Sequence, residues 1–395
     1  MPTVDFVTLS RSDYTSLRPV ALAAQQDPNI ETRVIVGGSH LLKRYGHSID
    51  QIKEDGVHVH DVADFLTEED DSPEELAAAY AKAAAECVRI FSKDRPDYIF
   101  LIGDRWEMLA VATAASLLHI PIVHHSGGDI TQGSSDNQTR YAISCLAHLH
   151  LVALDQHRKR LVHMGEESWR VMTVGEPALS HLLQYEGSDV DIYSKLNLAP
   201  GTPFVLSTFH PTSFDPLPAE RQIDVFLSVL KGIKEHLIIT APNPDSGSDL
   251  FLKKLRTFAD SSEHVQLFDS LGAKNYYAAM AHAKYMIGNS SSGLWEAPSF
   301  KLPVINVGPR QQGRAHGDNV ENVSLDDIEI KAAIHKVTRP DFKASLSGHN
   351  PYVQPNTVED ILNVLKKSYD KSELLAKRFV DPLAPPVLSP LRGEG

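Results

Sequence analysis

Short apolar runs alternate with longer amphipathic segments along almost the whole chain, and this alternation restricts the fold more than any other feature. The runs are unbroken, as in parallel strands whose two faces are both covered by helices. In the first half, strands are expected at 4–9, 32–36, 98–102, 121–124, 149–153 and 171–174, and helices at 74–91, 106–118 and 137–147. This order is typical of an α/β, Rossmann-like doubly wound domain.

The alternation stops at a polar stretch with Gly and Pro and then starts again. In the second half, strands are expected at 204–208, 237–240, 265–268, 285–288 and 304–307, and helices at 219–233, 249–258 and 276–282. Because 395 residues are too many for one ordinary core, we expect two αβα domains that face each other across a cleft. The expected parts are a first domain at 1–185, a linker at 186–203, a second domain at 204–356, a helix at 357–370 that returns to the first domain, and a flexible tail at 381–395.

Composition argues against several kinds of partner. The net charge is −13 and no long Lys/Arg block occurs, so nucleic acid is not expected as the main partner. No apolar run is long enough to span a membrane and no charged-then-apolar leader follows Met1, so we expect a cytoplasmic protein with no membrane partner. Cys87 and Cys145 lie in apolar, helix-like surroundings and are expected to be buried free thiols. No Cys/His spacing typical of zinc is present, so no metal is expected.

The most informative motif is the Ser- and Gly-rich segment 288–298, which follows an apolar strand and precedes a short helix. Ser290, Ser291, Ser292 and Gly293 would present hydroxyl and N–H groups at the start of that helix, where anions are favoured. Glu296 follows Ser292 by one helical turn and shares its face, so its carboxylate could bind two vicinal hydroxyls. The motif therefore suits a nucleoside diphosphate. The alternative is an ordinary serine N-cap beside a solvated glutamate.

Acidic residues gather after the strands of the first domain, at the sheet edge where ligands of open α/β folds bind. Asp104 and Asp129 each follow a strand, and Asp136 and Arg140 are four residues apart on one helix face. Carboxylates crowded in a dry cleft separate their pKa values, which leaves one as an acid and one as a base. Asp104, Asp129 and Asp136 are therefore the candidates for proton transfer. Alternatively, Asp104 caps a helix, Asp129 lies in a polar turn, and Asp136 and Arg140 form a surface pair.

Other strand ends carry groups suited to an anionic substrate. Arginines can contact phosphate across a cleft, and a cleft-facing histidine can contact a diphosphate leaving group. The candidates of this kind are Arg11, His40, Arg140, His210, Asn243, Arg310 and Arg314. Taken from the residues alone, the chain is expected to be a two-domain enzyme that uses carboxylate acid/base chemistry on a nucleotide-linked substrate.

Over residues 11 to about 323 the chain resembles the sugar-nucleotide 2-epimerases, and more closely their hydrolysing branch. The resemblance rests on residues 288–300 with Pro303, Gly308, Arg310, Gln311, Gly313 and Arg314, and on residues 38–40, 103–105, Glu107, Met108, Gly127, Gly128, His210 and Pro211. It implies the GT-B arrangement of two Rossmann-like domains and a homodimer or homotetramer.

The resemblance also implies a reaction. The hydrolysing branch converts UDP-N-acetylglucosamine to N-acetylmannosamine and UDP on the way to sialic acid, through anti elimination to 2-acetamidoglucal and then hydration. That route needs no cofactor. By resemblance, Ser290 to Gly293 and His210 would contact the diphosphate and Glu296 the ribose, while the carboxylates of the first domain would move the protons.

The departures from the family pattern lie in the first domain. The branch usually has His-Gly-Gly-Glu where this chain has Ser126-Gly127-Gly128-Asp129, and Asp-Glu and Arg-His where it has Asp136-Asn137 and Arg140-Tyr141. Alternatives therefore stay open: the same chemistry on UDP-2,4-diacetamido-trideoxyglucose of the legionaminic acid route, a non-hydrolysing 2-epimerase, and an inactive nucleotide-sugar binder. A GT-B glycosyltransferase is a fourth, which the order of the motifs disfavours.

Overall fold

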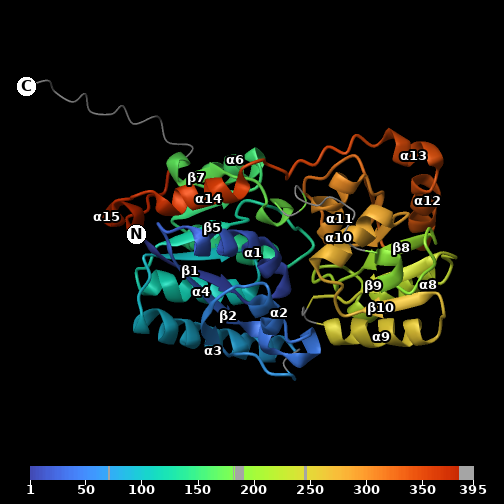
Figure 1. The fold of residues 1–395 in the computed structure, drawn as a ribbon, viewed down its shortest axis with the longest axis horizontal. Helices are drawn as coiled ribbons and strands as arrows, with labels where there is room; N and C mark the ends of the chain where they lie inside the picture. The colour runs from blue at the N-terminus through green and yellow to red at the C-terminus, as the bar shows by residue number, and fades with distance from the viewer. Residues whose placement is uncertain (70–71, 181, 183–190, 244–246, 382–395) are drawn as a thin grey trace, which may run out of the picture.

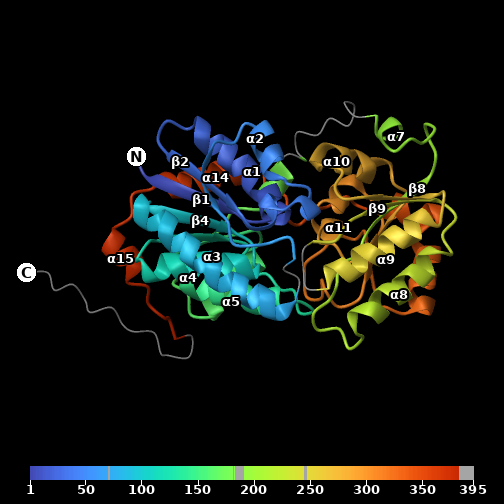
Figure 2. The same ribbon diagram turned by 90° about the horizontal axis from the view of Figure 1, so that it is seen from below.

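The computed structural model describes residues 1–69, 72–180, 182, 191–243 and 247–381. It contains two parallel β-sheets, each between layers of helices, which lie side by side along the long axis of the molecule (Figure 1, Figure 2). This confirms the fold class predicted from the alternation of apolar and amphipathic segments.

The first sheet has the strand order β3-β2-β1-β4-β5-β6-β7, and all its pairs are parallel. Chain order reverses direction between β1 and β4, which is where ligands of open α/β sheets bind. The strands are β1 (Thr3–Thr8), β2 (Glu31–Gly37), β3 (Val59–Ala63), β4 (Tyr98–Ile102), β5 (Ile122–His125), β6 (Leu149–Val152) and β7 (Val171–Thr173).

The second sheet has the order β10-β9-β8-β11-β12-β13 and is also parallel, with its reversal between β8 and β11. Its strands are β8 (Phe204–Thr208), β9 (His236–Thr240), β10 (Val265–Phe268), β11 (Met286–Gly288), β12 (Val304–Val307) and β13 (Val320–Val323). The serine-rich segment therefore begins at the end of β11, next to the reversal point.

Helices cover both faces of each sheet. In the first domain, α3, α4 and α5 pack on one face and α1, α2 and α14 on the other. In the second, α8, α9 and α12 pack on one face and α7, α10 and α11 on the other. The helices of the first sheet are α1 (Arg11–Gln26), α2 (Ile49–Glu54), α3 (Pro73–Lys93), α4 (Trp106–Leu117), α5 (Asp136–Leu146) and α6 (Asp155–His163). Those that follow are α7 (Ile192–Lys195), α8 (Ala219–Leu230), α9 (Ser248–Asp260), α10 (Ala273–His282), α11 (Ser292–Trp295), α12 (Asp327–Val337), α13 (Pro340–Ser345), α14 (Thr357–Lys366) and α15 (Lys371–Leu375).

Three elements beside the cleft or at the sheet edges were not expected from the sequence. The edge strands β3 and β13 are only partly buried, so they lack the unbroken apolar runs by which the central strands were identified. Helix α1 contains Pro19, which usually disfavours a helix interior. Its buried residues Leu17, Val20, Ala21 and Ala24 nevertheless follow helical spacing. The segment after β1 is therefore a helix that begins at Arg11.

Helix α14 lies against α1, and its buried Ile361, Leu362 and Leu365 belong to the same apolar cluster as Leu17 and Val20. Figure 1 shows this late segment beside the first domain rather than the second. Of the proposed linker, 186–190 lies outside the described residues, and the part from 191 to 203 contains α7. Nearly all of the proposed tail, at 382–395, lies outside the described residues.

Two smaller expectations have different outcomes. Cys87 is buried as predicted, but Cys145 is exposed because α5 turns that face toward solvent. Within the described ranges, no helix is long and apolar enough to cross a membrane.

Candidate active site

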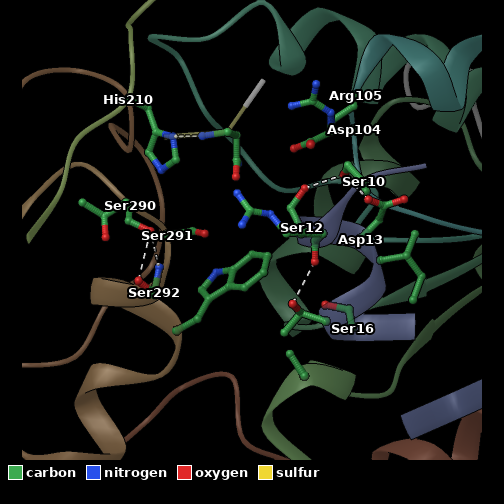
Figure 3. Close-up of a pocket in the computed structure, with 18 of the residues that line it drawn as sticks. Ser10, Ser12, Asp13, Ser16, Asp104, Arg105, His210, Ser290, Ser291 and Ser292 are labelled. Atoms are coloured by element: carbon green, nitrogen blue, oxygen red, sulfur yellow. Dashed lines mark hydrogen bonds between the residues drawn. The ribbon is translucent and has the colours of Figure 1, made fainter. Parts of the chain in front are cut away.

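A cleft of about 300 Å³ lies between the two domains, at the carboxyl ends of their central strands. This volume is within the range of small-molecule binding sites. Of the residues predicted for the site, the cleft is lined by Arg11, Asp104, Asp136, His210, Asn243, Ser290, Ser291, Ser292, Glu296, Arg310 and Arg314. Figure 3 shows Asp104 and Arg105 facing His210 and the three serines across this space.

The serine turn forms part of the second-domain wall. Gly288 makes the turn possible, because a Cβ at this position would lie 2.0 Å from the Thr208 carbonyl oxygen. Ser291 is the N-cap residue of α11, yet its side chain makes no capping hydrogen bond. Ser292 shares a hydrogen bond of 2.8 Å with the Tyr276 hydroxyl. The Ser291 hydroxyl therefore does not cap the helix, so the alternative of an ordinary serine N-cap does not apply to this residue.

His210 is fixed beside the serine turn by two asparagines. The Asn289 side chain accepts from the His210 N–H (2.7 Å) and donates to its carbonyl oxygen (2.8 Å). The Asn243 N–H donates to His210 Nδ1 (3.0 Å), so a neutral imidazole carries its proton on Nε2. Asn289 was not singled out from the sequence, although it lies inside the serine-rich motif.

Glu296 is buried in the same wall. Its Oε2 has no hydrogen-bond partner among the described residues. Burial, together with the nearby charge of Glu176, raises the pKa of Glu296 to about 7. A desolvated carboxyl of this kind is suited to accept hydrogen bonds from a ligand that carries hydroxyl groups.

Across the cleft, Asp104 forms a salt bridge with Arg140, whose side chain is completely buried. Two alternatives from the sequence are wrong here. The N-cap of α4 is Arg105 and not Asp104, and Arg140 reaches from α5 to the end of β4 instead of lying on the surface. Asp136 begins α5 and accepts from the Ser134 hydroxyl (2.9 Å) at the cleft.

Two further carboxyl groups line this wall and were missed. Glu107 accepts from Arg105 Nη2 (3.0 Å), and burial raises the pKa of Glu107 despite this guanidinium. Asp13 accepts from the Leu9 N–H (2.7 Å) and the Ser10 hydroxyl, and burial likewise raises the pKa of its carboxyl. The sequence signal for Asp13 was its place one turn into α1, after the first strand. That helix was not predicted.

Four predicted site residues do not line the cleft. His40 is fully buried behind α1, where its ring nitrogens contact Thr8 Oγ1 (2.9 Å) and Ser48 Oγ (2.7 Å). Gly293 faces β12, since a Cβ on it would lie 2.8 Å from Val304. Arg140 lies behind Asp104. Asp129 is buried in a salt bridge with Arg314 (2.8 Å). Their positions depend on partners that are distant in sequence.

Cations approach the serine turn from two sides. Arg310 and Gln311 both donate to the Asn289 carbonyl oxygen (3.2 and 2.8 Å). From the first domain, Arg11 donates to the Asp269 carbonyl oxygen (2.8 Å) and so spans the cleft. The described residues include no cluster of three or more His, Cys, Asp or Glu side chains that could hold a metal ion. The cleft thus combines an end lined by hydroxyl, imidazole and guanidinium groups with a wall of carboxyl groups.

Comparison with known proteins gives consistent results. Residues 22–366 match the family model described as UDP-N-acetylglucosamine 2-epimerase. The chain is 31% identical to the GDP/UDP-N,N'-diacetylbacillosamine 2-epimerase (hydrolyzing) of Campylobacter jejuni, over 95% of this chain and 98% of that protein. It is also 31% identical to the UDP-N,N'-diacetylbacillosamine 2-epimerase (hydrolyzing) of Legionella pneumophila, over 94% and 97% of the two chains.

Among solved structures, the UDP-GlcNAc 2-epimerase of Neisseria meningitidis bound to UDP-GlcNAc is similar with a TM-score of 0.78, at 16% identity, over 92% of this chain and 99% of that one. At this identity the likeness concerns the fold, which is of the GT-B type. The match of the family model and the two relatives extend over most of the chain, including both walls of the cleft. The chain therefore belongs to the UDP-N-acetylglucosamine 2-epimerase family, in its hydrolysing branch.

Proposed function

We propose that the chain hydrolyses a UDP-linked 2-acetamido sugar with inversion at C2, releasing UDP and the free 2-epimer. The observation that carries this proposal is the division of the cleft. Hydroxyl and imidazole groups at the ends of β8 and β11, with the buried Glu296, line the cleft together with Asp104, just after β4, and Asp136, at the start of α5. One wall fits a nucleoside diphosphate and the other fits proton transfer at the sugar.

The first step removes the C2 proton to a carboxylate of the first-domain wall. The C–H electron pair becomes the C1–C2 double bond, and the C1–O bond breaks with its electrons on the UDP oxygen. Ser291, His210 and the arginines of the cleft would stabilise the diphosphate charge. We assign the proton transfers to Asp104 and Asp136, which line the cleft.

The second step adds water across the double bond. The water oxygen joins C1, and C2 receives a proton on the face opposite to the one that lost it. The proton taken from C2 in the first step leaves on the UDP phosphate. In the second step one carboxyl supplies the new C2 proton and another accepts the proton of the water, so the site returns to its initial charge. The overall reaction consumes one water and forms UDP and the free sugar.

Two substrates are candidates. UDP-N-acetylglucosamine is the substrate implied by the family pattern. The diacetamido sugar nucleotide is favoured by the names of the Campylobacter jejuni and Legionella pneumophila relatives. Of the residues that depart from the family pattern, Ser126 lines the cleft and Asn137 Oδ1 accepts from Arg140 Nη1 (3.4 Å), so these two are suited to alter sugar choice.

The test is to incubate the protein with each sugar nucleotide in deuterated water and to follow the products by proton NMR. Free 2-epimer with deuterium at C2, plus UDP, is the expected result for one of the two. An epimerised sugar that stays linked to UDP would instead indicate the non-hydrolysing reaction. UDP binding without turnover of either compound would indicate a binder and overturn the proposal.

A further inference from the structure

Two loops from different domains pack against each other beside the cleft. One, at 126–135, connects β5 to α5, and the other, at 308–316, follows β12. The Gln132 N–H donates to the Gln312 carbonyl oxygen (3.3 Å). At Gly133 the two backbones approach so closely that a Cβ would lie 2.6 Å from the Pro309 carbonyl oxygen. We call this contact the loop junction. It joins the loop that contains Asp129 to the loop that contains Arg314.

The Asp129 carboxylate is buried at the loop junction, with 2% of the residue exposed. Its Oδ2 accepts from Arg314 Nε (2.8 Å). Its Oδ1 accepts from the Ile130 N–H (2.8 Å) and lies 3.3 Å from His157 Nε2. Burial alone would raise the pKa of Asp129, but Arg314 and His157 outweigh it and hold the value at about 2. Both carboxylate oxygens of Asp129 therefore interact with other groups of the protein, and the carboxyl group stays ionised.

Arg314 is held on three sides. Its Nε faces Asp129, its Nη1 donates to Gln311 Oε1 (2.9 Å), and its Cζ lies 4.8 Å from the centroid of the Trp295 ring. Within the described ranges, Nη2 has no hydrogen-bond acceptor. Arg314 and Trp295 both line the cleft. A guanidinium fixed in this way keeps donors available for an anionic ligand and loses little side-chain entropy on binding.

We propose that Asp129 is a positioning residue, which fixes the Arg314 guanidinium over Trp295 so that it meets the diphosphate of the substrate. This inference rests on the proposed function. The resemblance assigned Asp129 to proton transfer, but the cleft is not lined by Asp129, and its two oxygens are occupied. The longer glutamate usual in the branch would extend past this position by one methylene.

The test is calorimetric titration of UDP into the wild type, Asp129→Asn, Arg314→Met and the double variant. Asp129→Asn and Arg314→Met are each expected to raise the UDP Kd by about 10-fold or more, because each removes one partner of a buried charge pair. The double variant is expected to bind no more weakly than Arg314→Met, since both changes act through one contact. Asp136→Asn is the matched control, with a Kd within about twofold of the wild type, because Asp136 lies on the other wall.

Steady-state kinetics separate positioning from proton transfer. If Asp129 is a positioning residue, Asp129→Asn should raise KM and keep most of kcat at saturating substrate. Asp136→Asn, which removes a proton-transfer group, should instead lower kcat. Wild-type UDP affinity with a kcat as low as that of Asp136→Asn would overturn the inference. If the wild type itself does not bind UDP, the proposed function fails. If it binds UDP and Asp129→Asn binds equally well, only the role of Asp129 fails.

Asp129→Glu keeps the buried charge and provides a second variant should Asp129→Asn not fold. Because the Asp129 side chain is buried, the added methylene should displace the Arg314 guanidinium by about 1 Å and raise the UDP Kd several-fold. An unchanged Kd together with faster turnover would show that the carboxyl acts on the sugar, and would overturn the inference.

Discussion

The two walls of the cleft are built in different ways. The second-domain wall includes one short segment, in which Ser290 and Glu296 are six residues apart, and this segment presents hydroxyl groups and the unpartnered Oε2 of Glu296. The first-domain wall includes a charge pair between distant residues. Asp104 and Arg140 are 36 positions apart. The difference teaches that a contiguous motif can form a binding surface, whereas the charged wall exists only after the sheet has brought its strands together.

The walls also differ in what a substitution should change. Under the proposed function, side chains of the second-domain wall hold the nucleotide and those of the first-domain wall move protons. If this comparison is correct, changes on one wall alter UDP affinity and changes on the other alter turnover. A substitution that changes both UDP affinity and turnover, or that changes the quantity assigned to the other wall, would contradict the comparison.

The largest effect is expected from Asp104→Asn. The amide cannot exchange a proton as a carboxylate does, so turnover should fall by about 10² to 10⁴, the usual contribution of general acid–base catalysis. UDP affinity should change by less than about threefold, because the nucleotide contacts lie on the other wall. Steady-state kinetics and UDP calorimetry measure the two effects.

Loss of the charged partner of Arg140 is a separate consequence of the same change. Arg140 is fully buried, so its uncompensated charge should lower the melting temperature of Asp104→Asn. The UDP titration shows whether the variant is folded. Turnover close to that of the wild type in a folded variant would remove Asp104 from the chemistry.

The next largest effect is expected from replacing both Ser290 and Ser291 by Ala. Hydrogen bonds to a charged group contribute about 1.5 to 3 kcal/mol each, so loss of two should raise the UDP Kd by about 100-fold or more. The value of kcat at saturating substrate should stay close to that of the wild type. Ser228→Ala, on the exposed face of α8, is the control in the same domain. A loss of kcat with unchanged affinity would place these hydroxyls on the reacting atoms instead.

The sequence alone predicted the two-domain fold and several polar residues of the second-domain wall. Unbroken apolar runs identify central parallel strands such as β4 and β8, which are buried on both faces. The Ser290–Glu296 wall was predictable because its groups are neighbours in the chain. Local rules also placed Asp104 and Asp136 at the cleft, because Asp104 follows the end of β4 and Asp136 begins α5.

The rest depended on tertiary contacts. Asp129 follows a strand end just as Asp104 does, but Arg314, 185 positions away, draws its carboxylate into the loop junction. Asp13 and Glu107 were missed because their raised pKa values result from burial, which no local pattern shows. Helix α1 was missed because Pro19 and the polar residues at its start resemble a turn.

A moderate effect is expected from pH acting on Glu296. The pKa of this buried carboxyl is raised to about 7, so in the free cleft it is protonated at lower pH and ionised at higher pH. Ribose hydroxyls would donate to the ionised form, and binding must therefore release the proton below this pH. The UDP Kd should increase by up to about tenfold for each pH unit below 7, in the limit of one linked proton.

Glu296→Gln separates this effect from protonation of the UDP phosphate, which both proteins experience equally. The glutamine cannot titrate, so its Kd should follow a shallower pH dependence than that of the wild type. Calorimetry between about pH 5.5 and 8 covers the pH range around the expected pKa of Glu296. Parallel curves for the two proteins would mean that Glu296 does not meet the ligand.

The smallest effect on the reaction is expected from His40→Ala, because this histidine lies behind the first-domain wall. Burial, with the charge of Arg11 nearby, lowers the pKa of His40 to about 3, so the ring is neutral and acts through its contacts with Thr8 and Ser48.

Removing the His40 ring leaves a cavity and two hydroxyls without this partner, which should lower the free energy of unfolding by about 2 to 4 kcal/mol. Ser48→Ala loses only one of these contacts and should cost about 1 kcal/mol. The ring stays neutral in the folded protein but takes up a proton near its ordinary pKa when the chain unfolds, so its contribution to stability falls as the pH is lowered. The loss in melting temperature should therefore be larger at about pH 8 than at about pH 6. UDP affinity should stay within about twofold, because His40 does not line the cleft. A fall in UDP affinity at unchanged melting temperature would place His40 on the wall after all, and the first-domain wall would then share the nucleotide-binding role that the comparison gives to the second.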